Sequence, residues 1–517
     1  MITKRSLNYL HLLKKKMYLK MRNLLFFWIF ILAQVGLYAQ TQGIAYTAVG
    51  KGVATTFLTD YQCLGINTSA LGWGSGYEKK RVTMGSSEFA FGMYSDVLTS
   101  KKLKNFSNAI WSSLKGDTAT AFDWNKQRSA VADYATSGVS LFADYNWGGI
   151  SYQGKLLGGI AFNVHENYQF YSKLNQKTTD IIINGKLASL FDSLTINMNG
   201  VDVKVANTGS LSTDSMKAVV SGSMSVPLNL STLLNGTSIK MIWNRSYNLG
   251  YGRRVFAIDD VIELYAGIGG RLIKSMAMFE LDASPTGLSM FSSLSSIFKI
   301  DYPSVLNNGL NLKDYSGGIP PAVGSGYGLD FSVSAFLLGK FRVAMAVNNL
   351  GSVTYDRNVY GVKDTLVSAI KIDGINDLNL TRSINQLLNN GGLLTLKGTE
   401  KHTLVNASSF RLGGSFHYKQ QLGIGFDLVA PFNSDNPGNI KNAVISVGGD
   451  IRILKCVQLS AGFYGGGIYR SNFPMGINFI LKDGSYEFGV SSRDILTFFK
   501  TDTHSLSFAF GFARFRF

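Results

Sequence analysis

The fold is decided by the stretch from Ser409 to Leu428, which reads SFRLGGSFHYKQQLGIGFDL. Apolar side chains occupy every second position in two runs, on either side of Gln420 and Gln421: Phe410, Leu412, Phe416 and Tyr418, then Leu422, Ile424, Phe426 and Leu428. Successive side chains of a strand point to opposite faces, so this alternation predicts strands with one apolar and one polar face. We expect the two runs to pair as an antiparallel hairpin.

The same alternation extends over most of the chain. It continues from residue 445 to the last residue, Phe517, and it occurs upstream at residues 139–147, 327–335 and 341–347. Asp483-Gly484, a dipeptide typical of hairpin turns, separates two further runs. Counting the runs predicts about fourteen strands, an even number as in bacterial membrane barrels.

Two architectures produce such a pattern, a secreted β-sandwich and a transmembrane β-barrel. The runs are about nine to eleven residues long, the length that crosses a bilayer when tilted, whereas sandwich strands are usually about five or six. The polar phase is rich in Gly, Ser, Asp and Arg, which suits a wet or filled lumen better than an apolar sandwich core. The sequence therefore favours an all-β membrane protein, an antiparallel transmembrane β-barrel of about 14 strands.

Composition agrees with a barrel and argues against several other classes. Gly is abundant at 56 of 517 residues, Pro is scarce at 8, and charged residues make up 16%, against about 25% in ordinary soluble proteins. The mean hydropathy of +0.09 is too low for a protein with many membrane helices. The net charge of +17 is scattered over loops and strand ends rather than gathered on one face, so we expect no nucleic-acid partner.

Catalytic and metal-binding motifs are missing from the sequence. The five histidines do not form an HExxH or another ligand array, and the two cysteines, Cys63 and Cys456, stand far apart. Unpaired cysteines are favoured over a disulfide. We expect no enzyme activity, no cofactor and no metal.

The N-terminus predicts export. Basic residues precede an apolar segment of fourteen residues, Leu24 to Leu37, which is too short to span a membrane, and Ala39 offers a cleavage site. We predict a signal peptide at residues 1–39, a Gly- and Ala-rich lead-in at 40–80, and a barrel at 81–517 in the outer membrane. Inserts are expected near 94–137, where two amphipathic helices are predicted, and near 172–235, 282–324 and 355–403, the last with a helical stretch around 370–388.

Two short motifs carry a resemblance to a known superfamily. The lead-in contains Ala48-Val49-Gly50-Lys51-Gly52-Val53-Ala54 and Asn67-Thr68-Ser69-Ala70-Leu71, and the hairpin at 327–351 closes on Asn348-Asn349-Leu350-Gly351. Both resemble FadL/PorV-like outer-membrane β-barrels of Bacteroidota, most nearly an uncharacterised family of the DUF5723 kind. Thr68 stands where that pattern usually has proline. The resemblance implies fourteen strands and a lead-in folded inside the barrel as a hatch.

Charged residues on the polar phase are the candidate lumen or hatch contacts. They are Asp144, Glu263, Arg271, Asp330, Arg342, Arg411, Asp427, Asp450 and Arg452. In the last strand, Phe508, Phe510 and Phe512 lie in the phase opposite to Phe517. If Phe517 faces lipid, the three phenylalanines point inward; a bulge near Ala513 would reverse this.

Two functions remain open at this stage. Resemblance to FadL-like proteins implies a conduit for hydrophobic small molecules. Resemblance to PorV-like proteins implies a non-enzymatic scaffold that serves other outer-membrane proteins in secretion or assembly. Outer-membrane lipid is the expected surrounding in both cases.

Overall fold

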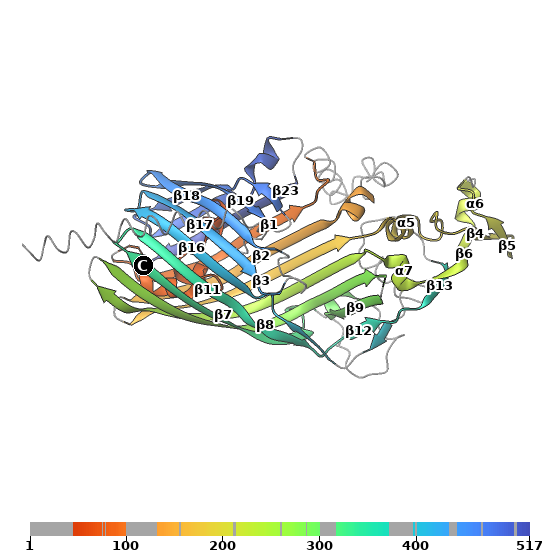
Figure 1. The fold of residues 1–517 in the computed structure, drawn as a ribbon, viewed down its shortest axis with the longest axis horizontal. Coiled ribbons are helices and arrows are strands. Elements are labelled where there is room, and N and C mark those ends of the chain that lie inside the picture. Colours follow the sequence, from red (N-terminus) through yellow and green to blue (C-terminus); the bar gives the residue numbers. More distant parts are fainter. Residues whose placement is uncertain are drawn as a thin grey trace, which may run out of the picture.

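The computed structural model describes residues 45–517 with gaps at 75, 78, 100–131, 155–156, 210–212, 259–260, 286, 300–316, 372–395, 399–400, 434–441, 467–468 and 501–503. Over these residues fourteen antiparallel strands close into a barrel (Figure 1). In barrel order they are β1 (Val82–Tyr94), β2 (Val139–Gly154), β3 (Gly158–Lys173), β7 (Ser238–Ile258), β8 (Ile262–Ser284), β10 (Gly324–Leu337), β11 (Phe341–Tyr355), β16 (Ser409–Tyr418), β17 (Leu422–Pro431), β18 (Val444–Leu454), β19 (Val457–Gly466), β21 (Met475–Leu481), β22 (Tyr486–Ser492) and β23 (Ser505–Arg516). Pairing of β23 with β1, from Thr83 opposite Arg516 to Tyr94 opposite Ser505, closes the ring.

The two ends of the barrel differ in the length of their connections. Hairpins such as β10–β11, β16–β17, β18–β19 and β21–β22 turn within a few residues at the end where Phe517 lies. Long connections, including those after β1, β3, β8 and β11, leave from the opposite end. Outer-membrane barrels have short periplasmic turns and longer extracellular loops. Following this convention, we refer to the end with short turns as the periplasmic end and to the opposite end as the extracellular end.

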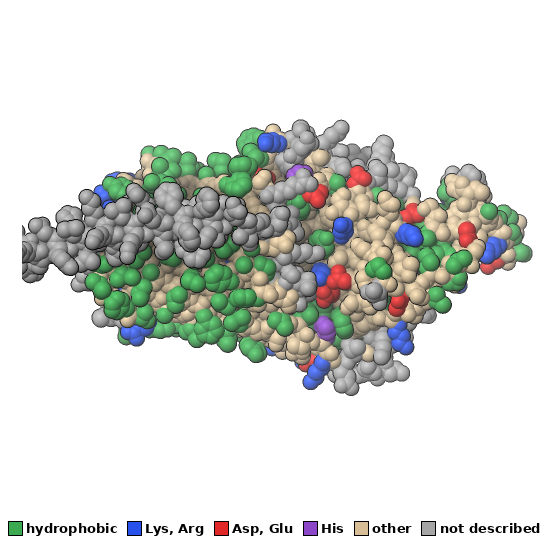
Figure 2. All heavy atoms as spheres, viewed as in Figure 1, with side chains coloured by type: hydrophobic (Ala, Val, Ile, Leu, Met, Phe, Trp, Pro, Cys, Tyr) green, Lys and Arg blue, Asp and Glu red, His purple; other side chains and the backbone are tan. Residues whose placement is uncertain are grey.

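An apolar band covers the outside of the barrel. Side chains such as Leu272, Phe331, Ile424, Val447 and Phe512 are exposed on the outward phase of their strands. Figure 2 shows hydrophobic side chains gathered over the barrel, with charged side chains mainly beyond its rims. Exposed apolar surface of this extent is stable in lipid, so the barrel spans a membrane. Among the described residues, no helix is long and apolar enough to cross one.

The lumen is filled by the chain that precedes β1. We call residues 45–74 the hatch; it contains α2 (Tyr46–Val49) and the 3-10 turns η1 (Asp60–Cys63) and η2 (Thr68–Trp73). Most of its residues are buried, and Ala48, Leu58, Tyr61 and Leu71 belong to one apolar cluster. The hatch expected for the lead-in is confirmed.

The extracellular inserts build a small second sheet. It contains β4 (Ser193–Met198), β5 (Val201–Ala206), β6 (Val219–Asn229) and β13 (Leu366–Ile370), with α5 (Gln176–Asn184), α6 (Thr213–Lys217) and α7 (Leu230–Leu234) around it. We call this the distal unit (Figure 1). Its core joins residues from β4, β6 and α7 to the tops of β8 and β9 (Gly287–Leu294).

Short elements complete the extracellular end. They are β12 (Val359–Val362), β14 (Leu396–Gly398), β15 (His402–Val405), β20 (Tyr469–Asn472), η4 (Ser296–Phe298) and η5 (Ile495–Phe498). β7 and β8 have 21 and 23 residues, more than a membrane crossing requires. The halves of β7 and β8 nearest the distal unit continue the hydrogen-bonded pairing of the barrel and support that unit. The predicted signal peptide, most of the helical region at 94–137 and most of that at 370–388 lie outside the described residues.

Of the two alternatives for the last strand, the structure has the one with a bulge near Ala513. Phe508 and Phe512 are 36% and 59% exposed on the outside, and Phe515 and Phe517 are also exposed, so the inward orientation of the phenylalanines is not found. The β22–β23 register shifts between Glu487 and Gly489, and this bulge reverses the phase of the last residues. Another sequence expectation is wrong in detail. The strand expected to end at Asn348–Gly351 instead continues to Tyr355 through a bulge.

Candidate functional site

A buried cluster of four charges joins the hatch to the wall at β22 and β23. Arg514 contacts Asp60 of the hatch and donates to Glu487 at 2.9 Å, and Arg516 donates to Glu487 at 2.5 Å. All four side chains are buried. The two acids and two bases balance, which is how charges are tolerated away from water. The cluster therefore ties the 3-10 turn η1 to the strands that close the barrel.

A carboxylate of β17 holds the middle of the hatch. Asp427 accepts hydrogen bonds from the amides of Ala54 and Thr55, at 2.7 and 2.9 Å, and from the Thr55 hydroxyl at 3.0 Å. A second ion pair joins Lys51 to Asp450 on β18. Bonds to a charged acceptor are about twice as strong as neutral ones. These contacts anchor the hatch to the side of the barrel opposite η2.

Serines of β10 hold the end of the hatch. Ser332 accepts from the amide of Ser69 at 2.7 Å, and Ser334 lies 2.7 Å from the Ser69 hydroxyl and accepts from the Trp73 indole at 2.9 Å. Inward-facing positions of a strand recur at every second residue, so a Ser-x-Ser pair presents two hydroxyls side by side.

Inward-facing glycines let the hatch lie directly against the wall. A Cβ on Gly448 would lie 1.9 Å from the Lys51 carbonyl oxygen, and one on Gly462 would lie 2.3 Å from the same atom. No side chain fits at such a distance from backbone. The high glycine content is therefore explained in part by contact with the hatch.

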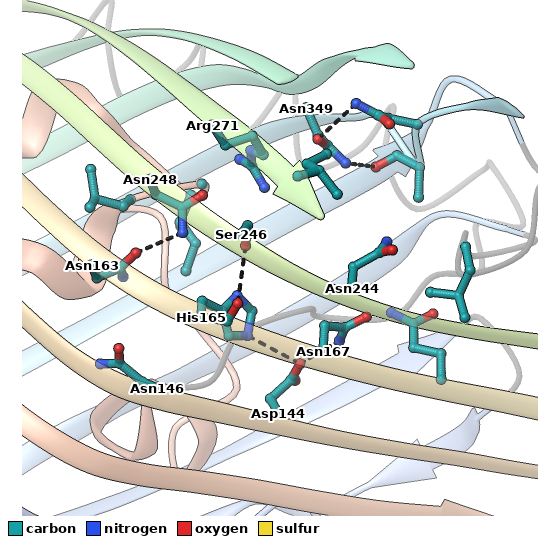
Figure 3. A pocket seen from close by; sticks show the side chains of 18 of the residues that line it. Asp144, Asn146, Asn163, His165, Asn167, Asn244, Ser246, Asn248, Arg271 and Asn349 are labelled. Atoms are coloured by element: carbon teal, nitrogen blue, oxygen red, sulfur yellow. Dashed lines mark hydrogen bonds and ion pairs between the residues drawn. The ribbon is translucent and has the colours of Figure 1, made fainter. Parts of the chain in front are cut away.

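On the extracellular side of the hatch lies a cavity of about 170 Å³, which we call the outer chamber (Figure 3). One wall is polar and consists of inward side chains of β2, β3 and β7: Asp144, Asn146, Asn163, His165, Asn167, Asn244, Ser246 and Asn248. Beside this wall the lining includes the apolar residues Ile273, Val353 and Leu404, together with Arg271, Asn349 and Asn406. The hatch residues Gln62 to Ile66 line the chamber from below.

On the periplasmic side lies a second cavity of about 200 Å³, the inner chamber. It is bounded by Lys51, Phe57 and Tyr77 and by charged wall residues such as Arg342 and Asp450. Gln62 lines both chambers. Its side chain accepts from the Thr47 hydroxyl at 2.8 Å and donates to Glu88 of β1 at 2.7 Å. The two cavities therefore approach each other at a side chain that is hydrogen-bonded to the hatch and to the wall.

The nine charged residues singled out from the sequence lie on the inward phase, and the structure brings several of them together. Arg271 pairs with Asp330 at 2.7 Å. The Arg342 guanidinium lies 5.1 Å from the ring centre of Trp73 in the hatch. Arg411 is buried near Asp427, and Arg452 donates to Tyr77. Asp144 accepts from Asn167 in the outer chamber, and Glu263 pairs with Arg254 near the periplasmic rim, away from both chambers.

Sequence reasoning missed the residues that divide and line the chambers. Glu88 accepts hydrogen bonds from Tyr61 and Gln62, both at 2.7 Å. It was missed because apolar and polar residues alternate only weakly in its strand. The asparagines of β3 and β7 do alternate with apolar residues, so the period of two could have identified them. Among the described residues, no group of three or more His, Cys, Asp or Glu side chains could hold a metal ion. Cys63 and Cys456 are both free.

Comparisons with known proteins return structures only. No family model matches the chain, and no curated protein matches it. Among solved structures, the chain is similar to a deletion mutant of the TodX monoaromatic hydrocarbon channel, with 11% identity, a TM-score of 0.42, and coverage of 92% of this chain and 98% of that one. It is also similar to the toluene transporter TbuX of Ralstonia pickettii, with 12% identity, a TM-score of 0.41, and coverage of 92% and 98%. The toluene transporter TodX of P. putida matches with 9% identity, a TM-score of 0.33, and coverage of 91% and 95%.

Proposed function

We propose that the protein is a gated conduit that carries hydrophobic small molecules across the outer membrane. One observation carries the proposal: Gln62 of the hatch lines both the outer and the inner chamber, so the two cavities approach each other at this residue. The apolar residues of the outer chamber, Ile273, Val353 and Leu404, form the surface against which a hydrophobic molecule would lie.

The barrier at Gln62 is small enough to open by local movement. Two hydrogen bonds hold its side chain, one within the hatch and one to Glu88. A net contribution of about 1 kcal/mol per neutral bond, and more to a charged acceptor, makes opening rare without making it forbidden. The strong anchors at Asp60 and Asp427 hold the hatch at other points, so it can stay attached while Gln62 moves.

A change at Gln62 tests the conduit. Gln62→Ala removes the side chain that lines both chambers, together with its hydrogen bonds to Thr47 and Glu88. We expect proteoliposomes that carry the Gln62→Ala protein to take up labelled toluene faster than proteoliposomes that carry its parent. Equal uptake by the variant, the parent and protein-free liposomes would refute the conduit.

The scaffold hypothesis gains no support from this geometry, because the contacts that organise the lumen join the hatch to the wall.

A further inference from the structure

The polar wall of the outer chamber is a ladder of amides on three neighbouring strands. Asn146 of β2 lies opposite His165 of β3, and Asn163 and Asn167 of β3 lie opposite Asn248 and Asn244 of β7. All of these side chains line the chamber (Figure 3). Inward positions of a barrel wall need only be polar, so a concentration of one side-chain type beside a cavity points to recognition.

Several amide oxygens of this wall are buried without a protein partner. The Oδ1 atoms of Asn146, Asn244 and Asn248 have no hydrogen-bond partner among the described residues. Asn146 and Asn248 are only 2% and 7% exposed. Their amide nitrogens are engaged, by Glu88 at 3.1 Å and by Asn163 at 2.7 Å. A buried polar atom left unpaired costs about 1–3 kcal/mol, so the wall is poised to accept donors from a ligand.

Hydroxyl groups suit this wall better than charged groups. A hydroxyl both donates and accepts, so it satisfies an amide in either of its two orientations. Two charged groups that line the chamber already have partners, since Arg271 pairs with Asp330, and Asp144 is contacted by Asn167 and by His165 at 3.4 Å. A charged ligand placed against the amides would lose its hydration without gaining an opposite charge from them.

The size of the cavity and the apolar residues beside the amides define the rest of the ligand. The cavity of about 170 Å³ is comparable with the cavity of about 150 Å³ that holds benzene in an engineered protein. Ile273, which pairs with Ser246 on the neighbouring strand, and Val353 and Leu404 present apolar surface next to the amides. A single ring can therefore place one face or edge on this apolar surface and its substituents on the amides.

We propose that the outer chamber binds a neutral six-membered ring that carries two or more hydroxyl groups, which hydrogen-bond to amides of this wall; Asn146, Asn244 and Asn248 offer the amide oxygens without a partner among the described residues. The inference rests on the proposed conduit, for which this chamber is the entry site. A hydroxylated aromatic and a cyclic polyol share this chemistry, and both are included in the test.

Calorimetric titration of the full chain in detergent micelles tests the inference. Catechol, myo-inositol and toluene are the probes, because they are close in ring size and differ in hydroxyl groups. We expect catechol or myo-inositol to bind at least fivefold more tightly than toluene. The probe that binds more tightly shows whether the ligand is a hydroxylated aromatic or a cyclic polyol. Binding of toluene as tight as that of both hydroxylated probes overturns the inference and leaves the conduit standing.

Variants locate the binding. Asn244→Leu and Asn248→Leu keep the side-chain size and remove the amides, and at least one of the two is expected to weaken binding of the hydroxylated probe about fivefold, the equivalent of about 1 kcal/mol. Asn197→Leu in the exposed part of the distal unit is the matched control and should leave binding unchanged. Unchanged binding in both chamber variants also overturns the inference. Failure of the conduit itself is seen separately, as toluene uptake that is equal in proteoliposomes with the Gln62→Ala protein, proteoliposomes with its parent and protein-free liposomes.

Discussion

Replacing Asp60 by Asn should loosen the hatch, and the loosening can be measured at a native thiol. Asp60 is 1% exposed and contacts Arg514. Its φ of 55° lies in the left-handed region, which Asn adopts as readily as Asp, so the substitution changes charge and not backbone. Its Oδ1 also accepts from the Gln62 amide at 3.2 Å, a bond that Asn can keep. The change therefore isolates the ion pair.

The magnitude follows from the buried cluster. Arg514 keeps Glu487 at 2.9 Å but loses one of its two acidic partners, so the four-group cluster gains one uncompensated positive charge. A hydrogen bond to a charged group contributes about 1.5–3 kcal/mol. Each 1.4 kcal/mol is a factor of about ten in an equilibrium constant. We expect the population with an open hatch to rise by roughly 10- to 100-fold.

Cys63 provides the readout, because it lies in the hatch next to this cluster and is completely buried. In a Cys456→Ser background it is the only thiol, and its labelling by a maleimide requires the hatch to open. When opening is fast and rare, the labelling rate is proportional to the open population. The Asp60→Asn variant should therefore label roughly 10- to 100-fold faster than its parent.

A matched control separates the ion pair from a general charge effect. Asp202 is an exposed residue of the distal unit, and Asp202→Asn should label at the parental rate. A mobility shift between unheated and heated protein in a detergent gel checks that each barrel is folded. A folded Asp60→Asn protein that labels within about twofold of its parent would contradict the reasoning that the four-charge cluster holds the hatch.

Three further predictions concern the wall and the distal unit. Gly448→Val places side-chain atoms onto a hatch carbonyl and should accelerate labelling of the hatch thiol, whereas Gly270→Val, where a Cβ meets nothing within 4 Å, should not. Phe512→Lys puts a charge on the lipid face and should destabilise the barrel by about 2–4 kcal/mol in urea unfolding from lipid vesicles; an unchanged midpoint would place Phe512 away from lipid. Hydrogen bonds from the Ser231 hydroxyl and amide hold the pKa of Asp364 below its usual value. Because the folded pKa is depressed, this contact stabilises α7 fully above the ordinary carboxyl pKa of about 3.9 and is lost as pH falls through the folded value. Hydrogen exchange of α7, corrected for intrinsic pH dependence, should show this loss, and Asp364→Asn should abolish it.

The sequence by itself determined the strands and the faces of most of them. Alternation is a local property, since each side chain points away from its neighbours whatever the rest of the chain does. For this reason the alternation alone was enough to assign Arg411, Asp427 and Asp450 to the polar phase. The same reasoning left two orientations open for Phe508, Phe510 and Phe512, because a bulge near Ala513 adds one residue and reverses the phase, and alternation alone does not show whether the bulge is present.

Only the tertiary structure decided what the inward residues contact. Asp427 and Thr55 are 372 positions apart in the chain, and Asp60 and Arg514 are 454 apart. No local pattern can pair residues at such separations, because the closed barrel brings them together. The same holds for Gly448, which looks like a weak point of its strand until the hatch carbonyl is seen against it. The alternation determined that there is a lumen, and the hatch folded within it decided where the lumen is closed and where the chambers remain.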